Sequence, residues 1–112
     1  MKTKTITITG KEVGVAYCYA TEIAFRKYTG VGVENFDPAN PEHAAYIILA
    51  AILAYYQHKG EDAPVTDKDI IYETSPQDII DAMTAVFQLR AEWYNLPAGE
   101  PEDKEEDKPK NP

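Results

Sequence analysis

The chain has 112 residues, of which 44% are hydrophobic, and a net charge of −8. About 95 of these residues are available for folding, enough for one small domain and too few for two. The negative charge argues against binding to nucleic-acid backbones or to anionic membranes. One cysteine cannot form an intramolecular disulfide, and no secretory signal opens the chain, so we expect a cytoplasmic protein.

The composition changes near the C-terminus. Apolar residues stop at Trp93-Tyr94-Asn95-Leu96-Pro97, and the remaining segment is dominated by charge and proline, with six acids and three lysines between Glu100 and Lys110. Such a segment cannot bury a core. We therefore expect one domain over residues 1–96 and a disordered charged tail over residues 97–112.

Apolar and polar residues alternate along the N-terminal segment, as they do in two β-strands. Residues 3–9 place Ile6 and Ile8 on one face and the threonines on the other. Gly10-Lys11 can make a tight reversal, and apolar side chains alternate again over residues 12–17. We predict an antiparallel hairpin whose apolar face packs on helices or on a partner, because a lone hairpin is marginal in water.

A helical period begins at Tyr19, and Gly30 suits the left-handed position just after a helix. The predicted stripe of this first helix consists of Ala20, Ile23, Ala24, Lys27 and Tyr28. Residues 31–40 form a turn-rich connection with Phe36 as its only large apolar anchor. The length of this connection makes it a candidate mobile loop.

A second helix is predicted from Pro41 to about Lys59, capped by Asn40 and stopped by Gly60. Its centre, residues 47–54, is apolar around the whole circumference, which is typical of a helix surrounded by neighbours. The longest apolar stretch is shorter than the roughly 20 residues that cross a bilayer. We expect a buried core helix, or one with a face against a second protomer.

The last helix is predicted to have Ser75 as its cap and Pro76 in first position, with Asp78 placed to return a bond to the amide of the cap residue. Its apolar stripe and the residues beside it are Ile79, Ile80, Met83, Val86, Phe87, Arg90, Trp93 and Tyr94. This stripe is wide for one core, which leaves room for an interface.

Between the two long helices, Thr66 can cap a short helix over residues 67–73 that places Ile70 and Ile71 against the body. The predicted fold class is therefore α+β and mostly α. An N-terminal β-hairpin packs on a small bundle of about four helices, and a disordered acidic C-terminal tail follows.

No catalytic, cofactor-binding or metal site is predicted. His43 and His58 lie 15 positions apart on one helix, about 22 Å, and cannot share a metal. Cys18 is better explained as a small buried residue than as a nucleophile. The acids of residues 61–73 lack the glycine and the regular alternation of a calcium loop. We therefore expect a protein without enzymatic activity.

The aromatic residues are more suggestive, because eight tyrosines is a high number for this length. Tyrosine and tryptophan are favoured where a partner buries a surface. The candidate partner-binding residues are Tyr55, Tyr56, Phe87, Trp93 and Tyr94. The alternative is that these rings close the ends of the helical core.

The order of parts is also informative. A short hairpin opens at residues 2–12, a short helix ends at residues 26–30, and an apolar helix over residues 44–56 precedes the segment 74–83. In this layout, in length and in its charged C-terminal tail, the chain resembles the tail assembly chaperones of long-tailed phages and prophages over residues 2–96.

The resemblance implies a non-enzymatic protein of the bacterial host cytoplasm. Such a protein coats the long helical tape-measure protein and keeps it soluble until tail-tube subunits polymerise around it. The implied partners are the tape-measure protein and further copies of the chain. In many relatives a programmed frameshift adds a second C-terminal domain.

Two other classes remain open. One is a small acidic inhibitor that imitates DNA and binds a host nuclease or restriction enzyme, although much of the acid here lies in caps, loops and the tail. The other is an enzyme without a recognisable motif, which predicts a concave pocket with convergent polar groups and carboxylates of perturbed pKa.

Overall fold

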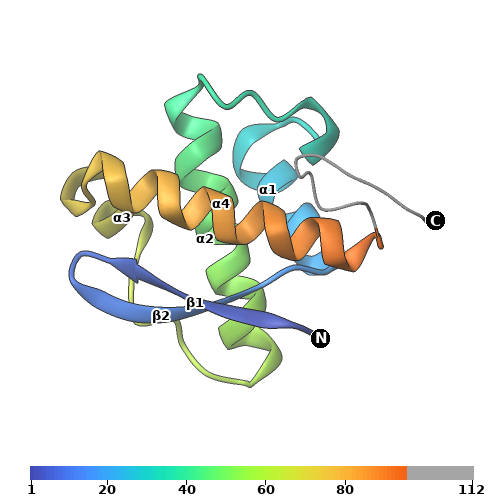
Figure 1. The fold of residues 1–112 in the computed structure, drawn as a ribbon, viewed down its shortest axis with the longest axis horizontal. Coiled ribbons are helices and arrows are strands. Elements are labelled where there is room, and N and C mark those ends of the chain that lie inside the picture. Colours follow the sequence, from blue (N-terminus) through green and yellow to red (C-terminus); the bar gives the residue numbers. More distant parts are fainter. Residues whose placement is uncertain (96–112) are drawn as a thin grey trace.

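The computed structural model describes residues 1–95. In chain order its elements are β1 (Thr3–Ile8), β2 (Lys11–Ala16), α1 (Tyr19–Thr29), the short 3-10 helix η1 (Val33–Asn35), α2 (Pro41–His58), α3 (Asp67–Glu73) and α4 (Pro76–Trp93). The fold is α+β and mostly α, with a hairpin against four helices, as predicted (Figure 1). The predicted disordered tail, residues 97–112, lies outside the described residues.

Helix α2 forms the centre of the domain. Its buried residues follow no single stripe: Ala44, Ala45, Ile47, Ile48, Leu49, Ala50, Ala51, Ile52 and Ala54. Helices α1, α3 and α4 and strand β2 all pack against it, and α4 crosses it (Figure 1). Within residues 1–95, no helix combines the length and the apolar character needed to cross a membrane. The prediction of a buried core helix is confirmed.

The hairpin is antiparallel, but its reversal lies one residue earlier than predicted. Ile8 pairs with Lys11, so the turn residues are Thr9 and Gly10, with φ of 50° and 78°. Two positive φ values in a two-residue loop give the twist that fits a hairpin. Strand β1 packs on α4 and β2 packs on α2.

Strand β2 is buried on both faces, whereas the alternation predicted one. Gly14 lies on the face opposite the expected apolar residues, and the ring of Tyr55 covers it so closely that a Cβ there would clash. The backbone N–H of Gly14 donates to the hydroxyl of Tyr56 at 3.1 Å. The last turns of α2 therefore cover the second face of the strand, and this approach requires glycine.

Helix α1 presents a different face from the predicted one. Thr21 and Phe25 are fully buried, whereas Ile23 is 66% exposed. The hydroxyl of Thr21 accepts from the N–H of Cys18 at 3.2 Å and donates to the carbonyl of Ala16 at 3.1 Å. This threonine links the end of β2 to the first turn of α1 and sets the rotation of the helix, which the apolar pattern alone could not show.

Residues 31–40, the candidate mobile loop, make more contacts with the rest of the domain than expected. Phe36 packs against the core, and Val33 in η1 is a second buried anchor. The N–H of Asp37 donates to Nδ1 of His43 at 3.0 Å. His43 therefore fastens the connection to the first turn of α2.

The three predicted helix caps are present. The side chain of Asn40 accepts from two amides of α2, and Ser75 accepts from the N–H of Asp78 at 3.2 Å. The reciprocal carboxylate bond expected at Asp78 forms at α3 instead, where Thr66 N–H donates to Asp69 at 2.8 Å. Short connections between helices are thus fixed by side chains close in sequence.

Gly14→Ala should lower the free energy of unfolding by about 1 to 3 kcal/mol, the usual range for overpacking a filled site. The added methyl group must displace the ring of Tyr55. Chemical denaturation followed by circular dichroism measures this change. In a Tyr55→Ala background the same substitution should cost less, and an equal cost in both backgrounds would contradict the proposed contact.

Candidate functional site

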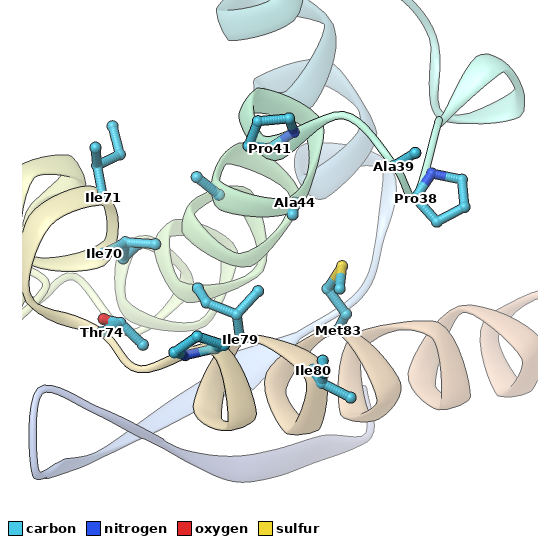
Figure 2. Close-up of a pocket in the computed structure, with 12 residues that line it drawn as sticks. Pro38, Ala39, Pro41, Ala44, Ile70, Ile71, Thr74, Ile79, Ile80 and Met83 are labelled. Atoms are coloured by element: carbon cyan, nitrogen blue, oxygen red, sulfur yellow. The ribbon is translucent and has the colours of Figure 1, made fainter.

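The candidate site is an apolar groove of about 480 Å³ between the start of α2, helix α3 and the first half of α4 (Figure 2). Its lining consists of Pro38, Ala39, Pro41, Ala44, Ala45, Ile70, Ile71, Thr74, Pro76, Ile79, Ile80 and Met83. We call this set the apolar groove. In Figure 2, Ile79 and Met83 extend from α4 toward the start of α2.

Two isoleucine pairs build the sides of the apolar groove. In α3, Ile70 is buried, whereas the adjacent Ile71 is 48% exposed. In α4, Ile79 packs partly on the core, whereas Ile80 is 51% exposed. Neighbouring positions on a helix point about 100° apart, and in these two helices one member of each pair faces the core while the other is half-exposed. The prediction that both residues of the α3 pair lie against the body is therefore wrong for Ile71.

The apolar groove has almost no polar chemistry. Thr74 is the only lining residue with a polar side chain, and its hydroxyl already donates to the carbonyl of Asp69 at 3.0 Å. The lining includes no charged residue. Across residues 1–95, no group of three or more histidine, cysteine or acidic side chains is arranged to hold a metal. The arrangement suits burial of another apolar surface rather than the orientation of a polar substrate.

Two of the predicted partner-binding residues, Tyr55 and Tyr56, lie at the end of α2 and contact the hairpin. Tyr55 and Tyr56 are half-buried, with ring centroids 4.7 Å apart. Both reach Gly14 in β2, as described above. The ammonium of Lys59 lies 4.8 Å from the centroid of the Tyr55 ring and donates to its hydroxyl at 3.3 Å. That hydrogen bond is the main cause of the raised pKa of Lys59.

The other three candidate partner-binding residues lie along α4. Phe87 is partly buried against Phe36, with centroids 4.8 Å apart. Trp93 is 41% exposed and meets Tyr19 edge-to-face at 5.6 Å. Tyr94 is 39% exposed at the end of the helix. The five candidates thus contact three different parts of the fold, and none of them lines the apolar groove.

A second cluster joins the two ends of the domain. Glu22, in the first turn of α1, accepts hydrogen bonds on the same carboxylate oxygen from the hydroxyls of Tyr17 at 2.8 Å and Tyr94 at 2.6 Å. The guanidinium of Arg90 lies over the ring of Tyr94 at 5.2 Å. Burial is the main cause of the raised pKa of Tyr17, whereas the bond to Glu22 is the main cause for Tyr94.

The remaining candidates have structural positions. His43 holds the connection before α2, and His58 is exposed at the other end of that helix. Cys18 is a free thiol at the junction of β2 and α1, half-buried rather than buried as expected.

Sequence reasoning missed both the apolar groove and the role of Glu22. The isoleucine doublets in α3 and α4 were the available signal for the groove, because two adjacent apolar positions widen the apolar face of a helix. An acid in a first helical turn is usually explained by the helix dipole, so Glu22 gave no signal of its own.

Tyr17→Phe should make the free energy of unfolding less dependent on alkaline pH. Because the folded-state pKa of Tyr17 is raised, its contribution is fully present below the ordinary pKa of about 10 and falls as pH rises above it. The slope from this one group approaches about −1.4 kcal/mol per pH unit. Denaturation between about pH 8 and about pH 11 tests this against Tyr72→Phe, a change at an exposed position. A constant difference between wild type and Tyr17→Phe would contradict it.

Comparison with known proteins gives no relative for this fold and site. No protein-family model, no curated protein and no solved structure matches the chain. A functional assignment therefore depends on the apolar groove and on the residues around it.

Proposed function

We propose that the protein is a non-enzymatic tail assembly chaperone that binds the tape-measure protein of a long-tailed phage or prophage in the bacterial host cytoplasm. The observation that supports this function is the apolar groove, a concave surface without charged lining residues. A chaperone for a long apolar helix needs such a surface to replace the contacts that the helix lacks before assembly.

The dimensions of the apolar groove suit a helix. Its lining residues on α4 extend from Pro76 to Met83, a rise of about 10 Å, which matches two turns of a partner helix. Apolar side chains at helical spacing on the partner could then pack between α3 and α4. Ile71 and Ile80 stand half-exposed where such a helix would make its contacts.

Self-association is the second part of the proposal, because coating a long partner requires many copies. Trp93 and Tyr94 are exposed at the end of α4 opposite to the apolar groove, about 15 Å along the helix from Met83. Contacts between copies through these rings leave the groove free. This arrangement is compatible with many subunits on one tape-measure protein.

An acidic inhibitor that imitates DNA is less well supported. Several carboxylates of the folded surface are engaged locally, as Asp69 is with Thr66 and Asp81 is with Gln77. A DNA-like surface also requires carboxylates in rows, with no use for an apolar groove between them.

The double variant Ile71→Ser/Ile80→Ser tests the proposed function. Each half-exposed isoleucine contributes about 1 kcal/mol of contact, so the variant should bind the tape-measure protein about 30-fold more weakly. Isoleucine and serine have similar helix propensities, so the fold should persist. Co-expression followed by size-exclusion chromatography measures how much tape-measure protein stays soluble.

Ile23→Ser is the matched control, because Ile23 is an exposed isoleucine on α1 away from the groove. Full solubilisation by the groove variant, or equal losses in variant and control, would contradict the proposal. Circular dichroism of each variant verifies that the fold is retained.

Trp93→Ala/Tyr94→Ala should reduce self-association more than thermal stability, because both rings are more than a third exposed. Light scattering of the eluted protein gives the number of copies, and thermal unfolding gives the stability. A lower melting temperature with unchanged association would show that these rings only close the core.

A further inference from the structure

The negative charge of the described body is concentrated in one segment of the chain, part of which lines the apolar groove. Residues 61–81 contain seven acids and one lysine, a net charge of −6, whereas residues 1–60 have a net charge of +1 and residues 82–95 are neutral. The segment 61–81 comprises α3, the start of α4 and the loop before α3. Helix α3, the start of α4 and Thr74 between them supply half of the groove lining, whereas the loop before α3 supplies none of it.

Individual acids stand next to lining residues on all three helices. Glu42 follows Pro41 in the first turn of α2, and Glu73 precedes Thr74 at the end of α3. Asp78 and Asp81 flank the isoleucine pair of α4. Lys68 is the only basic residue in the segment. The apolar lining of the groove is thus bordered mostly by acidic residues.

Two possible occupants from the chain itself fit this surface poorly. The segment from Ala98 to Pro112 has no large apolar side chain and a net charge of −3, so it would bring neither apolar contacts nor opposite charge. A second copy docked groove to groove would bring Glu73, Asp78 and Asp81, which neighbour the lining, close to the same acids of the other copy. The complementary occupant is apolar on one face and basic on its flanks.

We infer that the apolar groove receives a basic amphipathic helix, with leucine-like residues on its inner face and lysine or arginine on both flanks. This inference rests on the proposed function and specifies which segments of the partner are bound. Apolar burial supplies most of the affinity. The acidic residues beside the groove favour basic over acidic helices and accelerate the encounter of the protein with its partner. Both effects depend strongly on salt concentration.

The experiment uses the full chain and two labelled helical peptides of about 18 residues, a length at which an isolated helix is marginal but accessible. Both have the same leucine face, and their polar faces contain lysines in one peptide and glutamates in the other. Fluorescence anisotropy should show the lysine peptide binding about tenfold more tightly at low salt. At about 0.5 M salt the two affinities should converge.

Glu73→Lys/Asp81→Lys should reduce the preference for the lysine peptide at least about threefold. The control Glu12→Lys/Glu92→Lys changes the net charge equally at exposed positions outside the groove lining and should leave the preference intact. Equal loss in both variants would overturn the inference, because the effect would then come from net charge alone.

The groove itself is tested separately with Ile71→Ser/Ile80→Ser, which should weaken both peptides. If wild type binds the two peptides equally and the groove variant binds neither, the charge inference is overturned. The proposed function would still stand. Binding that the groove variant does not weaken would overturn the groove as the docking site, and with it the observation that supports the proposed function.

Discussion

The structure depends on one constraint, which is that α2 is apolar around its whole circumference. A helix of this kind must be covered on every side, and a domain of this size has few elements with which to do so. Strand β2 covers one side, α1 and α4 cover others, and α3 covers part of the beginning. Ala44 and Ala45, in the first turns of α2, form part of the groove lining. The apolar groove therefore adjoins the beginning of this helix.

The same constraint explains the contact between Gly14 and the two tyrosines at the end of α2. Large rings can close over the backbone of a strand only where a position has no side chain, and Gly14 provides that position here. The hydroxyl of Tyr56 then takes the N–H that the two-stranded sheet leaves unpaired on that side. Packing and hydrogen bonding are satisfied by one pair of residues.

Signals within one element predicted the helices and strands well, whereas contacts between elements decided the features that those signals missed. The caps at Asn40, Thr66 and Ser75 and the stop at Gly30 depend on residues within one turn, and all four are present. The predicted buried face of α1 was wrong because the hydroxyl of Thr21 donates to the carbonyl of Ala16 in β2. An apolar pattern does not show such a hydrogen bond.

The site was harder to predict than the fold. Aromatic residues led to the interface prediction, and three of them, Tyr55, Tyr56 and Phe87, contact other parts of the domain. The apolar groove is built from isoleucine, alanine and proline, which are ordinary core residues in composition. The isoleucine doublets indicate a wide apolar face on each helix, but only the spatial arrangement of three helices shows that Ile71 and Ile80 stay half-exposed at one groove.

The packing of β1 on α4 has a consequence for how the chain acquires its structure during synthesis. The hairpin leaves the ribosome before the other described elements, yet α4, which packs on β1, is the last of them to be made. The bond between Glu22 and Tyr94 likewise joins residues 72 positions apart. A two-stranded hairpin alone is marginal in water, so the nascent chain cannot complete its core by stages. Folding has to wait for almost the whole domain to emerge, and until then the apolar residues of α2 are available to whatever binds unfolded chains.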